Sequence, residues 1–374
     1  MCTLSSVCSG LPRQLNSAIR TLQRPRLVPP HSDRCGSLRN AVTPPQSCPA
    51  LPFSLVAMAS FCSSSCTSGP VGREKYFSRS CFGDRGIPIR AVVTDLDGTL
   101  LNSDHLVSRA NVAACARLRQ KGIACVFATG RPHVGTVHCI GPAVLEEMGM
   151  PNAFPGVYMN GCLVYGSDGK LLHAEYLDKE LQKQVFSLLE ERNLVNRVCG
   201  YQGEGLFCCE KNPYTWYTKD EYDECEPVVL PSVDDLKNMN LCKLTFNGSP
   251  QEVTEFRALL EGFVKNGNGR CVQPIPRNVE FIPKSVSKAK GLDILFASMN
   301  ITKAEVVALG DSENDLEMLR HVDLSVCVAN GCESAKEAAK FVTLSNDQDG
   351  FAAVVKEICD DLEDRETKAT RGTA

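Results

Sequence analysis

Two aspartates separated by one residue follow an apolar run near the start of the chain's main body. In the stretch AVVTDLDGT, the run Ala91–Val93 leads to Asp95 and Asp97. Carboxylates this close repel each other unless a cation or a proton lies between them. Such pairs suit nucleophilic attack by one carboxylate and proton transfer by the other, and Gly98 allows the backbone to approach a ligand closely. We therefore expect Asp95 and Asp97 to be catalytic.

Polar residues also stand at three other places where an apolar stretch ends or the next helix begins. They are Thr129 and Gly130 in FATGR, Lys288 in SVSKAKGLDIL, and Asp311, Asn314 and Asp315 in VVALGDSENDLEML. In parallel α/β sheets, ligands bind beyond the carboxyl ends of the strands. The pattern predicts that these residues share one site with the two aspartates.

The elements that must position these residues alternate from residue 88 onward. IRAVVTDLDG, IACVFATGR, VVALGD and LSVCVAN read as buried strands. SRANVAACARLRQKG, with Ser108 as its N-cap, KAKGLDILFASM and FAAVVKEICDDL read as amphipathic helices. Apolar strands between such helices predict an α/β fold with a Rossmann-like parallel sheet covered on both faces.

A different segment, residues 162–277, interrupts this alternation. It contains a helix striped by Leu181, Val185 and Leu189, and a second helix with a capping box from Ser249 to Glu252. The chain from Thr129 to Lys288 is too long for one crossover, so we expect an inserted α+β cap domain. The predicted division is a leader (1–87), a core (88–161 and 278–362), the cap (162–277) and a flexible tail (363–374).

The leader is basic, whereas the body is acidic. Residues 1–90 hold 11 of the 40 Lys and Arg but only 3 of the 44 Asp and Glu. This Ser- and Arg-rich composition predicts an organellar transit peptide, with Met58 as a second start. The plastid is favoured over the mitochondrion, and the cytoplasm is the alternative if the leader is not a targeting signal.

The 20 cysteines are scattered without a C-x-x-C pair, which argues against a disulfide framework or a zinc site.

The combined residue set predicts phosphate chemistry with a metal. All-oxygen ligands with few protein donors suit Mg²⁺, and Lys288 and Thr129 suit phosphoryl oxygens. A calcium loop beginning at Asp95 is excluded, since it needs Gly at its sixth and Glu at its twelfth position, where Leu100 and Leu106 stand. Taken singly, each motif also has a structural interpretation as a helix cap or a solvated charge.

Four stretches, DLDGTLL, ATGR, the lysine in SVSKAKGLDIL, and GDSENDLEML, resemble the four motifs of the haloacid dehalogenase superfamily. They occur in the family's order and span about residues 88–362. YMNG, VEFIPKSVSK and VAN resemble the Cof-like phosphatase branch, in which a large α/β cap lies between the second and third motifs. One departure is Lys288-Ala289, where the branch has Lys-Gly.

The resemblance implies a role for each motif residue. Asp95 would be the nucleophile and Asp97 the general acid and base. Thr129, Gly130 and Lys288 would hold the phosphoryl group, and Asn314 would reach the substrate or its phosphate. Mg²⁺ would bind Asp95, the Asp97 backbone carbonyl and Asp311, with Asp315 orienting a water of the metal. Arg131 and Asn160 are left open between ligand contacts and turn structure.

The implied function is a Mg²⁺-dependent phosphomonoesterase for a small metabolite such as a sugar phosphate, FMN or pyridoxal phosphate. A phosphosugar mutase is one alternative, and it would need phosphate-binding arginines in the cap. A non-catalytic phosphate-binding regulatory protein is another. Dehalogenation is disfavoured because that chemistry does without the second aspartate. Neither a membrane nor a nucleic acid is expected as a partner, because the body lacks a basic patch and a spanning apolar run.

Overall fold

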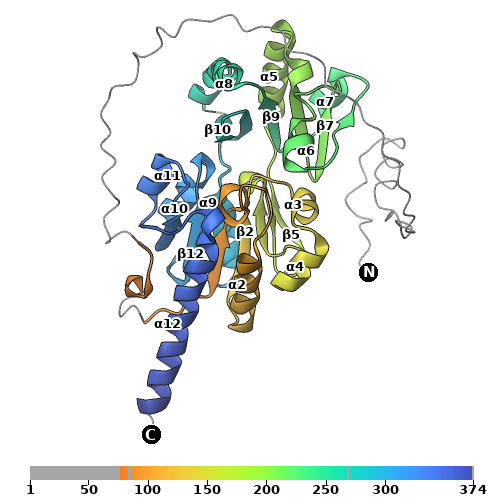
Figure 1. The fold of residues 1–374 in the computed structure, drawn as a ribbon. Coiled ribbons are helices and arrows are strands. Elements are labelled where there is room, and N and C mark those ends of the chain that lie inside the picture. The colour runs from red at the N-terminus through yellow and green to blue at the C-terminus, as the bar shows by residue number, and fades with distance from the viewer. Residues whose placement is uncertain (1–75, 83–85, 268, 373–374) are drawn as a thin grey trace, which may run out of the picture. The chain divides into compact units, whose positions relative to one another are not determined.

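The structure is a computed structural model that describes residues 76–82, 86–267 and 269–372. Nearly all of the predicted leader, including the second start at Met58, lies outside the described residues. The described residues belong to one compact unit. Within it, the described strands form two separate sheets (Figure 1).

The first sheet contains eight of the described strands, in the order β14-β13-β12-β1-β2-β3-β4-β5. Their bounds are β1 (Ala91–Thr94), β2 (Ala124–Ala128), β3 (Gly156–Tyr158), β4 (Leu163–Tyr165), β5 (Leu171–Ala174), β12 (Val306–Gly310), β13 (Leu324–Cys327) and β14 (Phe341–Val342). The six strands from β14 to β3 run parallel, and β4 and β5 add antiparallel pairs. Central β1 therefore ends beside β2 and β12.

Helices cover both faces of this sheet. They are α2 (Arg109–Gln120), α3 (His133–Ile140), α4 (Pro142–Met148), α9 (Lys288–Met299), α10 (Leu316–His321), α11 (Glu333–Ala338) and α12 (Gly350–Gly372). Val92 packs in one apolar cluster with residues of α2 and α12, whereas Val93 packs in another with α9 and α10. Alternate residues of β1 thus face opposite helical layers, and the predicted α/β fold is confirmed.

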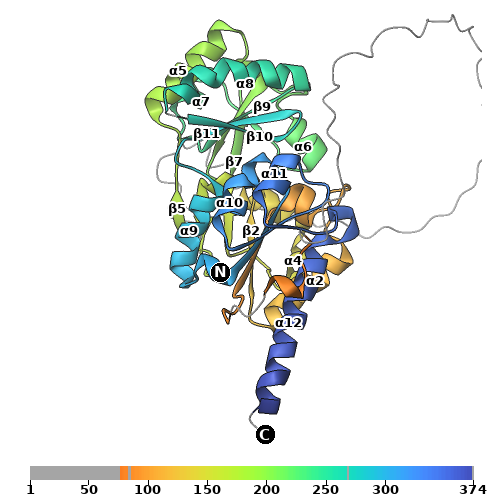
Figure 2. The same ribbon diagram turned by 90° about the vertical axis from the view of Figure 1, so that its left-hand side faces the viewer.

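The second sheet has six described strands, in the order β10-β11-β9-β6-β7-β8. The strands are β6 (Val198–Gln202), β7 (Gly205–Cys208), β8 (Val228–Val229), β9 (Lys243–Asn247), β10 (Gly269–Ile275) and β11 (Asn278–Pro283). Its helices are α5 (Lys179–Glu191), α6 (Tyr217–Tyr222), α7 (Val233–Asn238) and α8 (Pro250–Lys265). Helix α8 begins with the predicted capping box, and α5, α7 and α8 lie on one side of this cap sheet (Figure 2).

Strand pairing moves the predicted cap limits of 162 and 277. Strands β4 and β5 pair in the first sheet, although they follow residue 162, and β11 pairs in the cap sheet, although it follows residue 277. The two strands after YMNG extend the core sheet as an antiparallel meander, because antiparallel strands can be joined by short turns. The cap sheet therefore begins after Ala174 and ends at Pro283.

Both predicted ends of the body also need correction. Tyr76 pairs with Val342 of β14, and Phe77 and Phe82 are buried in the core cluster, so these residues are not part of a detached leader. At the other end, α12 continues through Gly372, although residues 363–374 were predicted to be a flexible tail. Ion pairs of Glu363 with Arg117 and of Glu366 with Lys121 tie the extension to α2.

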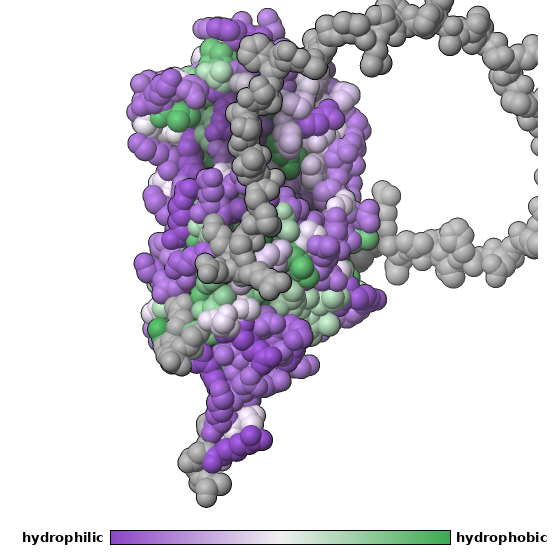
Figure 3. All heavy atoms as spheres, turned by 60° about the vertical axis from the view of Figure 1, so that its left-hand side comes forward, coloured by the Kyte–Doolittle hydropathy of each residue, from purple (hydrophilic) through white to green (hydrophobic). Residues whose placement is uncertain are grey.

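Hydrophilic residues predominate on the face of the described residues drawn in Figure 3. None of the helices within the described ranges combines the length and the apolar character that a membrane span requires.

Candidate active site

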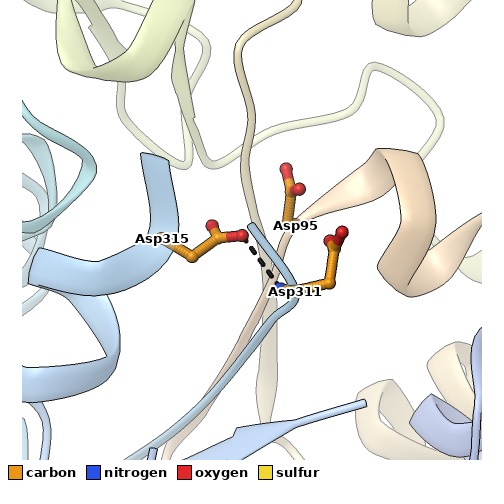
Figure 4. A group of neighbouring side chains, drawn as sticks. All are labelled: Asp95, Asp311 and Asp315. Carbon is orange, nitrogen blue, oxygen red and sulfur yellow. Dashed lines mark hydrogen bonds between the residues drawn. The ribbon is translucent and has the colours of Figure 1, made fainter. Parts of the chain in front are cut away.

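The site lies where β1 and β12 end. Parallel pairing sets Thr94 opposite Leu309, so Asp95 follows the last paired residue of β1 and Asp311 follows β12. In Figure 4 the carboxylates of Asp95 and Asp311 point the same way, and that of Asp315 approaches from the short helical turn η7 (Glu313–Asp315). Each of the three offers an oxygen within 4.8 Å of the others. The strand register thus brings three predicted residues together.

Lys288 is the cation of this cluster. It is the first residue of α9 and is fully buried, with its Nζ 2.8 Å from Asp95 and 2.7 Å from Asp315. Asp315 is also engaged by the backbone, because its second oxygen accepts the N–H groups of Asp311 at 3.0 Å and Ser312 at 3.1 Å. Asp315 therefore orients Lys288 and the turn after β12, as well as standing next to the other two carboxylates.

The turn after β1 has a backbone that fits only glycine at one position. Gly98 has φ +78°, and a Cβ placed on it would lie 2.6 Å from a carboxylate oxygen of Asp311. The neighbouring Thr99 donates its hydroxyl proton to Asp311 at 2.7 Å. This turn therefore fixes the position of Asp311 from the opposite strand.

The electrostatics of the cluster favour an added cation. Burial raises the pKa of Asp95, opposed by Lys288 and reinforced by Asp315 and Asp311. Burial, followed by repulsion from Asp315, raises the pKa of Asp311 to about 7. Burial lowers the pKa of Lys288, but Asp315 and Asp95 outweigh it and raise the value overall. Three carboxylates with one ammonium thus leave uncompensated negative charge among oxygen donors, which suits Mg²⁺.

Asp97 is not one of the three clustered carboxylates and has a different cation as its partner. Both of its oxygens accept hydrogen bonds from the Arg131 guanidinium at 2.7 Å, and Nδ1 of His105 lies 3.6 Å away. Burial would raise the pKa of Asp97, but Arg131 and then His105 lower it well below its usual range. Arg131 also donates to the backbone carbonyl of Tyr222 in the cap, at 2.8 Å. The two aspartates therefore have separate partners and separate electrostatic environments.

The predicted phosphate-binding residues Thr129 and Gly130 follow β2, the strand next to β1. The Thr129 hydroxyl accepts the Arg131 backbone N–H at 3.1 Å, so its own proton is directed elsewhere. Asn314 donates to Asn160 at 2.9 Å, and Asn160 has a left-handed backbone with φ 58°. Asn160 thus braces Asn314, and the backbone N–H of Asn160 also donates to the Thr129 carbonyl oxygen at 2.9 Å.

Comparison with known proteins identifies the family. The profile described as haloacid dehalogenase-like hydrolase matches residues 92–355, which is most of the chain. The chain belongs to this family of hydrolases. The match spans the strand ends that carry Asp95, Thr129, Lys288 and Asp311, and the expectation of a haloacid dehalogenase-like phosphatase is confirmed at the level of the family.

Three similar proteins illustrate the relationship. The chain is 28% identical over 295 residues to Phosphatase YwpJ of Bacillus subtilis, and this alignment covers 72% of this chain and all of that protein. It is 29% identical over 269 residues to Endoribonuclease YBEY, chloroplastic, of Arabidopsis thaliana, covering 71% of this chain but only 45% of that longer protein. A HAD/COF-like hydrolase structure from Plasmodium vivax superposes with a TM-score of 0.71 at 29% identity, covering 75% of this chain and 99% of that one.

Two charged residues at the site of this haloacid dehalogenase-like hydrolase were missed from the sequence. Lys243 of β9 and Glu280 of β11 are buried, and they contact the residues around Gly130 and Asn160. Both stand alone inside apolar strands, in LCKLTF and NVEFIP. A lone charge in an otherwise buried strand is the signal that identifies such residues, because Lys and Glu are rarely buried without a partner.

Proposed function

We propose that the chain is a Mg²⁺-dependent phosphomonoesterase that acts on a small organic phosphate through a phosphoryl group carried on Asp95. The observation that carries this proposal is the separation of the two aspartates. Asp95 lies among the cation-seeking carboxylates and against Lys288, whereas Asp97 is held apart by Arg131. This separation supports attack by one carboxylate and proton transfer by the other.

The fit of Mg²⁺ rests on the donor set described above. Asp95 and Asp311 would hold the ion directly, together with the Asp97 backbone carbonyl. The carboxylate of Asp315 is occupied by Lys288 and two backbone N–H groups, so Asp315 would act through a water rather than directly. When bound, Mg²⁺ neutralises charge on the carboxylates and on the phosphoryl oxygens.

In the first step, an Asp95 carboxylate oxygen attacks phosphorus and the bond from phosphorus to the ester oxygen breaks. The leaving oxygen takes a proton from Asp97, and Asp95 becomes an acyl phosphate. Lys288 and Thr129 hold the phosphoryl oxygens. In the second step, Asp97 accepts a proton from a water that attacks phosphorus. The water oxygen joins the released phosphate as the bond between phosphorus and the Asp95 oxygen breaks, and both aspartates return to the forms they had before the first step.

Arg131 sets a condition on the first step. Its bidentate ion pair keeps Asp97 ionised in this conformation, whereas the leaving oxygen needs a proton. A substrate phosphate monoanion entering beside Arg131 offers the guanidinium a competing anionic partner. Asp97, released from the ion pair, then takes the proton of this monoanion and holds it for the leaving oxygen. The ion pair with Asp97 supports a site role for Arg131 over the turn-capping role that the sequence left open.

The phosphosugar mutase alternative is weakened by the cap arginines. Of the five arginines between residues 162 and 277, all in the described part of the chain, four have protein partners. Arg197, Arg257 and Arg270 pair with Glu252, Glu313 and Glu317, and Arg277 donates to the Gly248 carbonyl oxygen. A set already paired in this way is poorly suited to bind a second phosphate.

The test is release of phosphate by the full chain from p-nitrophenyl phosphate and a panel of sugar, nucleotide and pyridoxal phosphates. We expect turnover with Mg²⁺, none with EDTA, and a loss of at least about a thousandfold in Asp95→Asn. Asp104→Asn, an exposed carboxylate in the same loop region, is the matched control and should keep wild-type activity. Equal activity of Asp95→Asn and wild type would refute the proposal.

We also propose that the residues before Tyr76 direct the chain to the plastid. Support comes from the basic composition of that part of the sequence, and from the Arabidopsis relative, whose name describes it as chloroplastic.

A further inference from the structure

The cap sheet contains a buried ion pair between neighbouring strands. Lys243 of β9 and Glu280 of β11 are 2% and 6% exposed, and the Lys243 ammonium donates to a Glu280 carboxylate oxygen. Lys243 also lies over the ring of Tyr201, 4.4 Å from its centroid. Burying two charges carries a large desolvation cost, and apolar residues of similar volume usually stabilise a fold at least as well. Stability alone therefore gives no reason for this pair.

The pair extends from the cap to the loop after β2 of the core. Lys243 donates to the carbonyl oxygen of Gly130 at 2.8 Å. Glu280 accepts a hydrogen bond from the side-chain amide of Asn160, whose own backbone N–H donates to the carbonyl oxygen of Thr129 at 2.9 Å. Two successive carbonyl groups of this loop are thus bound, one by Lys243 directly and one by the residue that Glu280 holds.

The residues on either side of Gly130 are also held by β3 and the turn after it, because the Thr129 N–H donates to the Val157 carbonyl oxygen at 2.9 Å and the Met159 N–H donates to the Arg131 carbonyl oxygen at 3.1 Å. Gly130 has no side chain, and a Cβ there would lie 3.3 Å from the side-chain oxygen of Asn160. Gly130 can therefore be positioned only through its backbone. A shift of the backbone at Thr129 and Gly130 would move the Thr129 hydroxyl away from the position at which it would meet a phosphoryl oxygen.

We propose that Lys243 and Glu280 are positioning residues for phosphoryl transfer. They hold the Thr129–Gly130 turn in the orientation in which Thr129 donates to the transferring phosphoryl group. The cap would then contribute to the chemical step, in addition to enclosing the leaving group. This inference rests on the proposed phosphatase function.

A double variant separates this role from a structural one. Either single change leaves an unpaired buried charge, which strongly destabilises the folded protein. The double variant Lys243→Met with Glu280→Gln removes both charges and keeps an oxygen that can accept the hydrogen bond from Asn160. We expect the melting temperature of the full-length double variant to be close to that of the wild type. With p-nitrophenyl phosphate, kcat should fall at least about tenfold while KM changes less than about threefold, since the lost interaction matters in the transition state.

The matched control is Arg257→Met. Arg257 of the cap binds Glu313 of the core with N–O distances of 2.9 and 2.7 Å, so this variant also removes a cap-to-core ion pair but leaves the Thr129–Gly130 turn untouched. Its kcat should stay within about twofold of wild type.

Each outcome has one meaning. A stable double variant with wild-type kcat would overturn the positioning role, and so would an equal fall of kcat in Arg257→Met. An inactive wild type would instead refute the proposed phosphatase, and this inference with it.

Discussion

At the scale of single residues, Asp95, Asp311, Asp315 and Lys288 were predictable because each follows a strand end or begins a helix. The sequence could not show which carboxylate partners which cation. Asp97 is directed to Arg131 by the irregular turn after β1, and that direction depends on the φ of +78° at Gly98. Lys243 and Glu280 were missed because they act across two sheets whose relative placement is a tertiary property.

Gly98 provides a test of the metal site at this scale. Changing Gly98 to Ala places a Cβ within 2.6 Å of an Asp311 oxygen and forces the carboxylate to move. We expect the Mg²⁺ concentration for half-maximal activity to rise at least about tenfold, because one ligand is displaced. An Mg²⁺ titration of phosphate release measures this.

The control for that change is Gly122→Ala. Gly122 has a similar φ of +72° but no atom within 4 Å of the added Cβ, so it carries the backbone strain of about 1 kcal/mol without the clash. An unchanged Mg²⁺ midpoint in Gly98→Ala, or the same shift in Gly122→Ala, would contradict the proposed role of Gly98.

At the scale of elements, local signals predicted helices better than they predicted sheet membership. Ser108 is the N-cap of α2 and Ser249 is the N-cap of α8 as expected, because capping is decided within a few residues of chain. Strand β4 was assigned to the cap and β11 to the core, because pairing partners far away in sequence decide which sheet a strand joins.

The capping box of α8 predicts a pH-dependent contribution to stability. Hydrogen bonds from Ser249, followed by the ion pair with Arg197, lower the pKa of Glu252 to about 2. A carboxyl group with a lowered pKa stabilises the folded state above its ordinary pKa, and this contribution is lost as the pH falls through the folded value. We therefore expect Glu252→Gln to lower the free energy of unfolding by about 0.5 kcal/mol at neutral pH.

Urea denaturation as a function of pH measures the effect of Glu252→Gln. The difference in the free energy of unfolding between this variant and wild type should shrink between about pH 4.5 and pH 2, the interval over which the Glu252 carboxylate becomes protonated in the folded state. A difference that grows as the pH falls would contradict this explanation. Glu255→Gln, on an exposed position of the same helix, is the control and should show no such trend.

At the scale of the whole molecule, the folded body begins earlier than its composition predicted. Phe77 packs edge-to-face on Phe82, with ring centroids 5.4 Å apart, and on Phe341, at 5.7 Å. The short bridge at Tyr76 lies in a basic, Ser-rich stretch. Composition therefore gave no sign that Phe77 and Phe82 belong to the core. A targeting peptide must then be cleaved before Tyr76 if the mature protein is to keep its core.

Truncation tests this boundary. Residues 88–374 should be less stable than residues 76–374 by about 3 kcal/mol or more in urea denaturation, since two buried aromatic rings are removed. Import into isolated plastids, followed by N-terminal sequencing of the processed chain, should give a start at or before Tyr76. Equal stability of the two chains, or processing after Phe82, would contradict this assignment.

The central claim is that Asp95 carries the phosphoryl group. Its most direct test is acid quenching of the Asp97→Asn variant during turnover of p-nitrophenyl phosphate, followed by mass analysis of the peptide that contains Asp95. p-Nitrophenolate can leave without a proton from Asp97, whereas the water of the second step still needs Asp97 as its base. This variant should therefore accumulate the intermediate, and the peptide should gain the mass of one phosphoryl group at Asp95. A variant that still releases p-nitrophenol while the Asp95 peptide stays unmodified would contradict the account.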